Sequence, residues 1–395
     1  MKKGWEIKKL DDVCQTGSGG TPLSSRKEYY DNGTIPWLLS GEVSQGEVRA
    51  ATKFITKQGL ENSAARLFPR DTVLVAMYGA TAGQVGILRF EAATNQAVCG
   101  ILPNKLFVPE FLFYYFLAKK DDLVAQAAGN AQPNISQIKI RNTEVPLPPL
   151  AEQQRIVGLL DEAFEGLATA KANAEKNLQN ARALFESNLQ SVFTQRGPGW
   201  VNRQLSSLCV EITVGHVGSM KTEYKASGIP FLRSQNICPF EVSMENAMYI
   251  DEAFHRALKK SQLRPGDLAI VRTGYPGTAA VIPQELPDSN CSDLVIVRPS
   301  HEVNPHFLAA FFNSAFGKQL VLGKIVGAAQ KHFNITAAKE VMLHVPPIPE
   351  QGIIVAMVED LREETQHLAR VYERKLAALA ALKKSLLHQA FSGEL

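Results

Sequence analysis

Two long stretches of this chain repeat apolar residues at the spacing of an α-helix. One runs from Leu150 to Thr194 without a proline, and the other runs from Pro349 to Phe391. Alternate steps of four and three from Ile354 give Val358, Leu361, Thr365, Leu368, Tyr372, Lys375, Leu379, Leu382 and Leu386. The same steps from Ile156 give Leu160, Ala163, Leu167, Ala170, Ala174, Asn177, Ala181 and Leu184. These heptad patterns predict two long helices that pack together. The seam of one helix consists mainly of large side chains, and the seam of the other mainly of small ones.

Each helical stretch begins at a proline-rich segment. The segment VPLPPLAEQQRIVGLLD spans residues 145–161, and VPPIPEQGIIVAMVED spans residues 345–360. Proline fixes φ and lacks an N–H group, so it is suited to the start of a helix and not to its interior. Glu152 and Glu350 fall in the first turn, where the helix dipole favours negative charge. A motif of this length that occurs twice indicates an internal repeat.

Further matches extend the repeat along the whole chain. The paired segments are Gly4-Trp5 with Gly199-Trp200, Ile35-Pro36-Trp37 with Ile229-Pro230-Phe231, and Asn134-Ile135-Ser136 with Asn334-Ile335-Thr336. The chain therefore divides into two diverged halves, each a globular part followed by a long helix. A pseudo-two-fold arrangement of these halves would make the two helices antiparallel.

The globular parts mix short strand and helix patterns. Thr72–Tyr78 and Leu268–Arg272 are rich in β-branched residues and end near glycines, as strands do. Pro109–Ala128 and Pro305–Leu322 carry aromatic residues at helical spacing. We therefore expect an α+β fold in each half, with a curved sheet that is mixed or mostly antiparallel.

The composition of the chain limits its class. The net charge of +3 allows a nucleic-acid partner but does not demand one. The five cysteines form no C-x-x-C pair, which favours reduced thiols over a zinc site. The first residues lack the apolar core of a signal peptide, and no run of about 18 apolar residues is present. We expect a cytoplasmic protein that does not cross a membrane.

Motifs that would indicate catalysis are missing from the sequence. There is no G-x-x-x-x-G-K-[ST] phosphate loop, no H-E-x-x-H and no G-x-S-x-G. A methyltransferase would need an Asn- or Asp-Pro-Pro-aromatic tetrad, whereas Leu147 and Val345 precede the Pro-Pro pairs. We therefore expect a protein with no catalytic site, no bound metal and no cofactor of its own.

The loops of both halves carry residues suited to reading DNA bases. Arg pairs with guanine, and Asn or Gln pairs with adenine, through two hydrogen bonds each, while Lys binds phosphate. For any one of these residues, solvation in a loop or capping of a turn is the simpler explanation, so the hypothesis depends on the set. The candidates are Thr21, Ser40, Tyr78, Gly79, Thr81, Gln132, Asn134, Lys221, Arg233, Ser234, Gln235, Asn236, Arg272, Tyr275, Gln330, Lys331, His332 and Asn334.

Taken together, these motifs resemble those of the specificity subunit of type I restriction-modification systems. The resemblance covers the whole chain and depends on the two proline hinges, the two Gly-Trp openings, the Ile-Pro-[Trp/Phe] segments that follow a glycine and the ending SLLHQAFSGEL. The second hinge departs from the first at Gly352 and Ile353, where the first has Gln154 and Arg155.

The resemblance implies a division of the chain and a set of partners. Residues 1–148 and 198–346 would be two target-recognition domains, each reading one half of a bipartite site in double-stranded DNA. Residues 149–197 and 347–395 would be the central and distal helices, which set the gap between half-sites and dock two methyltransferase subunits. Restriction-translocase subunits would complete the complex, and S-adenosylmethionine, ATP and Mg²⁺ would belong to those partners.

Two other functions remain open from the sequence. A coiled-coil scaffold that binds only proteins would not bind duplex DNA in a salt-dependent way. A nuclease of an unfamiliar type would cut labelled DNA in the presence of Mg²⁺.

Overall fold

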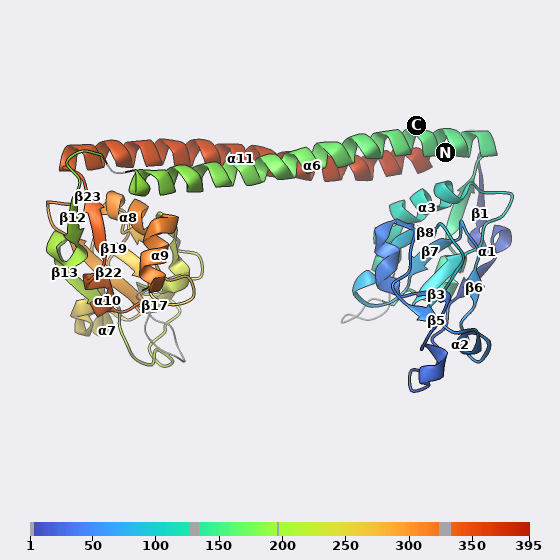
Figure 1. Cartoon of the computed structure of the whole chain (residues 1–395), viewed down its shortest axis with the longest axis horizontal. Coiled ribbons are helices and arrows are strands. Elements are labelled where there is room, and N and C mark those ends of the chain that lie inside the picture. The colour runs from blue at the N-terminus through green and yellow to red at the C-terminus, as the bar shows by residue number, and fades with distance from the viewer. Residues whose placement is uncertain (1–3, 127–133, 196, 324–332) are drawn as a thin grey trace. The chain divides into compact units, whose positions relative to one another are not determined.

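The computed structural model describes residues 4–126, 134–195, 197–323 and 333–395, which form two compact units (Figure 1). The first unit consists of Met1–Ala174 with Arg374–Leu395, and the second consists of Glu175–Glu373. Each unit thus contains one α+β domain, the first part of one long helix and the last part of the other. The predicted fold class, two similar domains joined by two long antiparallel helices, is confirmed.

The first unit contains two sheets and a short strand pair. One sheet has the strand order β2 (Thr16–Ser18), β10 (Val98–Ile101), β7 (Val73–Ala76), β8 (Val85–Leu88) and β4 (Glu47–Val48). The other has the order β5 (Phe54–Ile55), β3 (Ile35–Leu38), β9 (Ala92–Thr94) and β6 (Leu67–Phe68). Strand β1 (Glu6–Lys9) pairs with β11 (Glu144–Leu147). Its helices are α1 (Leu10–Val13), η1 (Lys27–Tyr29), η2 (Ser40–Gln45), α2 (Lys57–Glu61), η3 (Gly79–Thr81), α3 (Pro109–Ala118), α4 (Lys120–Ala125), α5 (Gln137–Arg141) and the start of α6 (Leu150–Thr194).

The second unit repeats this plan. One sheet has the order β13 (Cys209–Val214), β22 (Leu294–Pro299), β19 (Leu268–Val271) and β20 (Ala279–Val281). The other has the order β17 (Met248–Ile250), β14 (Ile229–Leu232), β21 (Ser289–Cys291) and β18 (Gln262–Leu263). Strand β12 (Val201–Gln204) pairs with β23 (Met342–Val345), and β15 (Ile237–Cys238) pairs with β16 (Glu241–Val242). Its helices are η4 (Leu205–Leu208), η5 (Ser234–Asn236), α7 (Glu252–Ala257), η6 (Lys259–Ser261), α8 (Pro305–Asn313), α9 (Ala315–Gly323), α10 (Ile335–Lys339) and the start of α11 (Ile348–Ser392).

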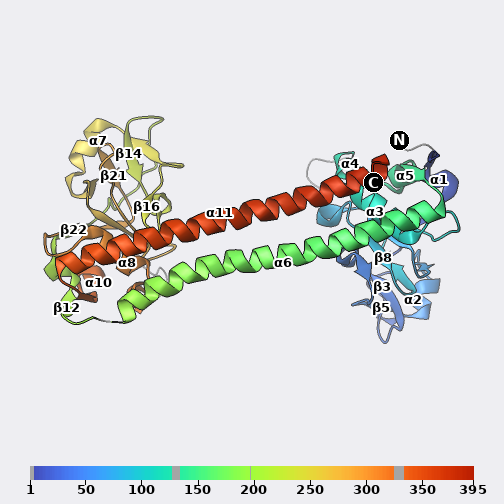
Figure 2. The same cartoon turned by 90° about the horizontal axis from the view of Figure 1, so that it is seen from above.

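Helices α6 and α11 are each 45 residues long, or about 67 Å at about 1.5 Å per residue. They are antiparallel within each unit (Figure 2). In the first unit, Arg155 near the start of α6 donates to the backbone oxygen of Leu395 at 2.7 Å. In the second unit, Arg182 near the end of α6 pairs with Glu373 of α11 at 3.0 Å.

The end of each long helix completes the core of the domain in which the other long helix begins. Phe391 of α11 packs edge-on against Phe111 of α3, with ring centroids 5.2 Å apart. In the second unit, Phe193 of α6 lies 5.5 Å from Phe311 of α8. These contacts bury apolar area in each domain core, so neither globular part forms its core from its own residues alone.

The predicted heptad seam is correct at some positions of each helix, including the buried Ala174 and Ala181 of α6 and Thr365 of α11, and wrong by one residue at others. In α11, Ile354 and Val358 are buried, but Leu368 is 40% and Leu382 is 48% exposed. In α6, Leu184 is 48% exposed, whereas the next residue, Phe185, packs against the core. An α-helix has 3.6 residues per turn, so a strict repeat of seven drifts by about 20° per heptad around a straight helix. The predicted seam residues Asn177 and Lys375 are likewise exposed.

At one place the structure pairs different residues of the two halves than the sequence comparison predicts. Ser136 caps α5 by accepting from the N–H of Lys139, and Asn334 caps α10 by accepting from the N–H of Ala337. Asn334 therefore corresponds to Ser136 and not to Asn134. The shared Asn-Ile pair in the sequence misaligned the two halves by two residues.

A buried glutamine joins each proline hinge to its domain. Gln153 is 0% exposed; its Oε1 accepts from the N–H of Val108 at 2.8 Å, and its Nε2 donates to the carbonyls of Leu106 and Pro148 at 2.9 Å each. Gln351 makes the equivalent bonds to Asn304, Glu302 and Pro346 in the second unit. The glutamine side chain satisfies both the carbonyl before the helix and the loop that leads into α3 or α8.

Replacing Gln153 with Leu should destabilise the first unit. The substitution removes the partner of the Val108 N–H and of the Leu106 and Pro148 carbonyls, and we expect a loss of about 3 kcal/mol in the free energy of unfolding. Urea denaturation followed by circular dichroism measures this loss. The control is Gln154→Leu on the exposed neighbouring residue, for which we expect a change within about 0.5 kcal/mol. Equal stabilities for the two variants would contradict a structural role for Gln153.

Candidate nucleic-acid interface

In the second unit, Asp293 connects two of the loops that the sequence predicts to read bases. Its carboxylate accepts from the Ser234 hydroxyl at 2.9 Å and also from the Thr273 hydroxyl. The backbone N–H of Arg272 points to the Asp293 carbonyl at 3.4 Å. Asp293 has a φ of 57°, a left-handed conformation that Asp tolerates. The 233–237 and 272–278 loops are thereby held in one fixed arrangement.

The turn after β19 presents an aromatic side chain beside a cavity. Gly274 and Gly277 have φ values of 80° and 91°, and between them Tyr275 is 84% exposed. The adjoining cavity has a volume of about 780 Å³. Its lining includes Ser234, Gln235, Ile237, Cys238, Thr273, Tyr275, Lys318 and Leu322. The structure thus brings together three predicted residues, namely Ser234, Gln235 and Tyr275, around one concave surface.

The two predicted arginines of this unit are partly engaged within the protein. Arg272 donates from Nε to the Phe333 carbonyl at 3.3 Å. Arg233 donates to the Asn246 carbonyl at 3.1 Å, and its guanidinium lies 5.9 Å from the centre of the Tyr224 ring. No carboxylate pairs with either arginine in the part of the chain that the structure describes. Each arginine is oriented by its neighbours and retains N–H groups that can bind an acceptor.

Asn236 is not available to DNA, contrary to the prediction. Its side chain is 0% exposed and donates to the carbonyls of Ser243 and Glu245 at 3.0 and 3.1 Å. Its oxygen accepts from the N–H of Arg233 at 3.0 Å. Asn236 therefore shapes the loop from within, because all its hydrogen-bonding capacity serves the backbone. The oxygen of Asn334 is similarly used, as the cap of α10.

In the first unit, the candidates form two groups. Tyr78 and Asn134 form an isolated antiparallel bridge, and the Thr81 hydroxyl donates to the Tyr78 carbonyl at 3.2 Å. Gly79 begins η3 with a φ of 69°, and η2, which begins at Ser40, packs beside η3. Thr21 lies apart from this group in sequence and donates from its hydroxyl to the side-chain oxygen of Gln96.

The remaining candidates are either exposed or not described. Lys221 is exposed, and no described carboxylate pairs with it. Gln132, Gln330, Lys331 and His332 lie outside the described residues, so their predicted roles stay predictions.

Two residues that contact these loops, and an arginine beside strand β2, were not predicted from the sequence. Asp293 and Gln96 act through hydrogen bonds to hydroxyls that are distant in sequence, so no local pattern marks them. The guanidinium of Arg66 lies over the Phe68 ring at 5.2 Å and also against Gly17. A Cβ on Gly17 would fall 0.6 Å from Nη2 of Arg66, so any larger residue there would require the Arg66 side chain to move. The sequence feature that could have pointed to Arg66 is its position directly before strand β6 (Leu67–Phe68).

The chemistry of the described residues does not centre on a metal or a thiol. Among them, no three His, Cys, Asp or Glu residues are grouped to hold a metal ion. All five cysteines are free. Burial raises the pKa of the Cys14 thiol to about 11 and that of the Cys99 thiol to about 12, so both are protonated and poor nucleophiles at neutral pH. None of the described helices is long and apolar enough to cross a membrane.

Comparison with known sequences finds relatives along the whole chain. Residues 2–178 match the family model described as the type I restriction modification DNA specificity domain. The type I restriction enzyme MjaIX specificity subunit of Methanocaldococcus jannaschii is 22% identical over 100% of this chain and 94% of its own length. The EcoKI specificity subunit of Escherichia coli is 23% identical over 100% of this chain and 90% of its own length.

Two solved structures share the fold. A chain from a study of complex assembly and conformational transition of the type I R-M system has a TM-score of 0.83 at 20% identity, covering 100% of this chain and 99% of that chain. The HsdS subunit from Thermoanaerobacter tengcongensis has a TM-score of 0.63 at 19% identity, covering 100% and 98%. The specificity-domain match over residues 2–178, the whole-length relatives and the shared fold make this chain similar to the specificity subunits of type I restriction-modification systems.

Proposed function

We propose that this chain reads a bipartite DNA site for a type I restriction-modification complex. Residues 1–148 and 198–346 act as the two target-recognition domains, and each reads one half-site. The helices within residues 149–197 and 347–395 set the gap between the half-sites and dock two methyltransferase subunits. The similarity to type I specificity subunits supports DNA sequence recognition by a subunit that is not catalytic.

One observation carries the proposal of two separate readers. The two domains are held to the long helices in the same way, by Gln153 with Phe391 in one unit and by Gln351 with Phe193 in the other. Their exposed loops, by contrast, differ in sequence: Tyr78-Gly79 in the first domain is matched by Thr273-Gly274-Tyr275 in the second. Because the two domains are attached to the helices in the same way but carry different loops, we infer that they present two different DNA-reading surfaces.

Partners supply the chemistry in this proposal. S-adenosylmethionine would be bound by the methyltransferase subunits, and ATP and Mg²⁺ would be bound by restriction-translocase subunits that join the larger complex. The complex would act on DNA in the cytoplasm, and this chain would contribute the choice of sequence.

Exchange of one domain tests the proposal. Replacing residues 199–345 with the same segment of another family member should change one half of the methylated motif and leave the other half intact. The measurement is methylome sequencing of a host that carries the exchanged chain with its methyltransferase partner. The reciprocal exchange of residues 1–148 is the control and should change the opposite half. A change in both halves after either exchange would refute the two-reader proposal.

Arg272 and Asn236 should differ in what their loss affects. Arg272→Ala should weaken binding to the specific site by about 1–3 kcal/mol if the arginine reads guanine. Asn236→Ala should lower the free energy of unfolding by about 1–3 kcal/mol, because it removes the hydrogen bonds that the buried Asn236 amide donates to the Ser243 and Glu245 carbonyls. Gln235→Ala, on the exposed neighbour, is the control for stability. An equal loss of affinity by Arg272→Ala for specific and random DNA would make Arg272 a phosphate contact.

A further inference from the structure

Phe240 has a backbone conformation that suits glycine. Its φ is 66°, whereas the other described non-glycine residues with positive φ are Asn32, Asp71, Asn246 and Asp293. Asn and Asp tolerate the left-handed region, but a bulky side chain is strained there. Strain of this kind persists only where the surrounding structure enforces it.

The turn that contains Phe240 explains the conformation. Ile237 pairs with Val242 and Cys238 pairs with Glu241, so Pro239 and Phe240 form the two-residue turn of the β15–β16 hairpin. A turn with Pro first and a positive φ second normally takes Gly or Asn at the second place. The corresponding residue of the first unit is indeed a glycine: Gly46, with a φ of 75°, precedes the same Glu-Val pair in β4.

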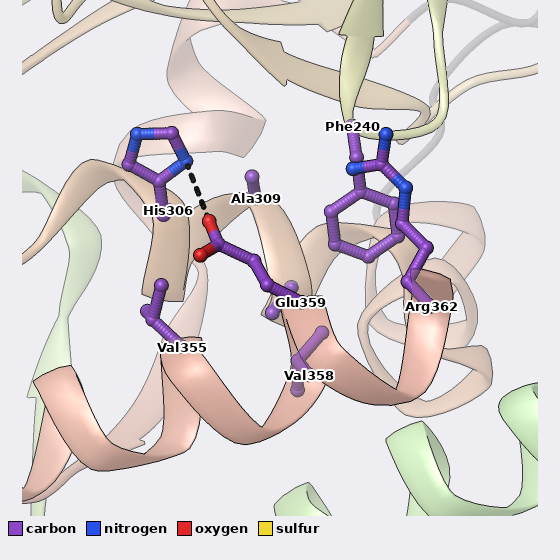
Figure 3. A pocket seen from close by; sticks show the side chains of 8 residues that line it. Phe240, His306, Ala309, Val355, Val358, Glu359 and Arg362 are labelled. Atoms are coloured by element: carbon purple, nitrogen blue, oxygen red, sulfur yellow. Dashed lines mark ion pairs between the residues drawn. The ribbon is translucent and has the colours of Figure 1, made fainter. Parts of the chain in front are cut away.

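The side chain of Phe240 contacts both long helices of its unit. Its ring lies edge-on to Phe185 of α6, with centroids 5.8 Å apart. The Arg362 guanidinium of α11 lies over the same ring at 5.3 Å, as Figure 3 shows. The surrounding pocket of about 100 Å³ also includes Val358 of α11 and His306 of α8, which pairs with Glu359 at 3.8 Å. The ring therefore packs where the domain and both helices meet.

The same hairpin is continuous with a candidate reading segment. Helix η5 (Ser234–Asn236) leads directly into β15, and Ser234 and Gln235 line the cavity beside Tyr275. A shift of Phe240 along the helices would move this segment with it, because only three residues separate Asn236 from Phe240. In the first unit Gly46 has no side chain at the equivalent place, and the nearest atom to a Cβ built there is Cζ of Phe113, 3.9 Å away.

We propose that Phe240 is a positioning residue that fixes the reading segment of the second domain to both long helices and so holds its half-site at one distance. This inference rests on the proposed function, in which the helices set the gap. The strained turn is retained because the ring that it presents bears on α6 and α11 together. Phe240 contacts no base in this account; it determines where the base-reading loop lies.

The test replaces Phe240 with Gly in the full chain, expressed with its methyltransferase partner in a host lacking other specificity subunits. Glycine relieves the strained backbone and removes the ring, so the variant should fold. Methylome sequencing should then find the two half-sites unchanged in sequence but methylated at gaps one base pair longer or shorter as well as at the wild-type gap. Loss of packing alone would lower activity at all sites without widening the range of gaps.

Two further variants keep the test decisive. Phe240→Tyr retains the ring and should keep the single wild-type gap. Phe185→Leu combined with Arg362→Gln removes both ring contacts without altering the turn, and should widen the gap as Phe240→Gly does. If Phe240→Gly does not fold, this double variant decides the question.

The outcomes separate the inference from the function on which it rests. A single unchanged gap in a folded, active variant without the ring or its contacts would overturn the positioning role. A changed sequence in the second half-site would also overturn it, because Phe240 would then shape the reading loop itself. Failure of the wild-type chain to direct methylation to any bipartite site would instead refute the proposed function.

Discussion

A long helix can hold a DNA-reading domain in place only if the junction between them is rigid. In each unit this rigidity depends on one buried glutamine, Gln153 or Gln351, whose amide bonds three backbone groups at once. The proline hinge cannot satisfy these groups itself, because proline has no N–H to donate. The same hydrogen bonds that begin the helix therefore also fix the loop into α3 or α8.

The second constraint is that each domain uses the end of the other long helix. Phe391 and Phe193 fill equivalent places beside Phe111 and Phe307, so the core of each domain includes residues from both halves of the sequence. Each domain is thus held by two helices that run in opposite directions. Contacts to two helices restrict rotation of the domain more than contacts to one helix do, as the proposed reading of DNA in a fixed register would require.

The division of the chain into two similar halves with two long helices could be predicted from the sequence, because it depends on local signals that occur twice. The proline hinges predicted where α6 and α11 begin, and the apolar spacing predicted their length. The seam was misplaced at Leu184 and Leu382 because a strict heptad ignores the drift of a 3.6-residue helix. The α+β domains could be predicted as a class, but their strand order could not, because it depends on pairings between distant residues such as β3 with β9.

The candidate interface could be predicted less well than the fold, because it depends on tertiary contacts between loops. Residue type suggested Asn236 and Ser234 equally, but only tertiary contacts show that Asn236 is buried and that Ser234 lines a cavity. Asp293 carries no sequence signal, since its role is to accept from hydroxyls on two other loops. The φ of Phe240 was also hidden, because Pro-Phe is an unusual choice for its turn.

The central claim is that the helices set the distance between half-sites, and lengthening them tests it most directly. The boundary between the units falls after Ala174 in α6 and after Glu373 in α11, so four residues would be inserted at both places. Four residues add about 6 Å of helix and overshoot one turn by about 40°. DNA rises about 3.4 Å per base pair and turns by a similar angle, about 10.5 pairs making one turn. Methylome sequencing should show the same half-sites with a gap longer by one or two base pairs, whereas an unchanged gap with full activity would contradict the claim.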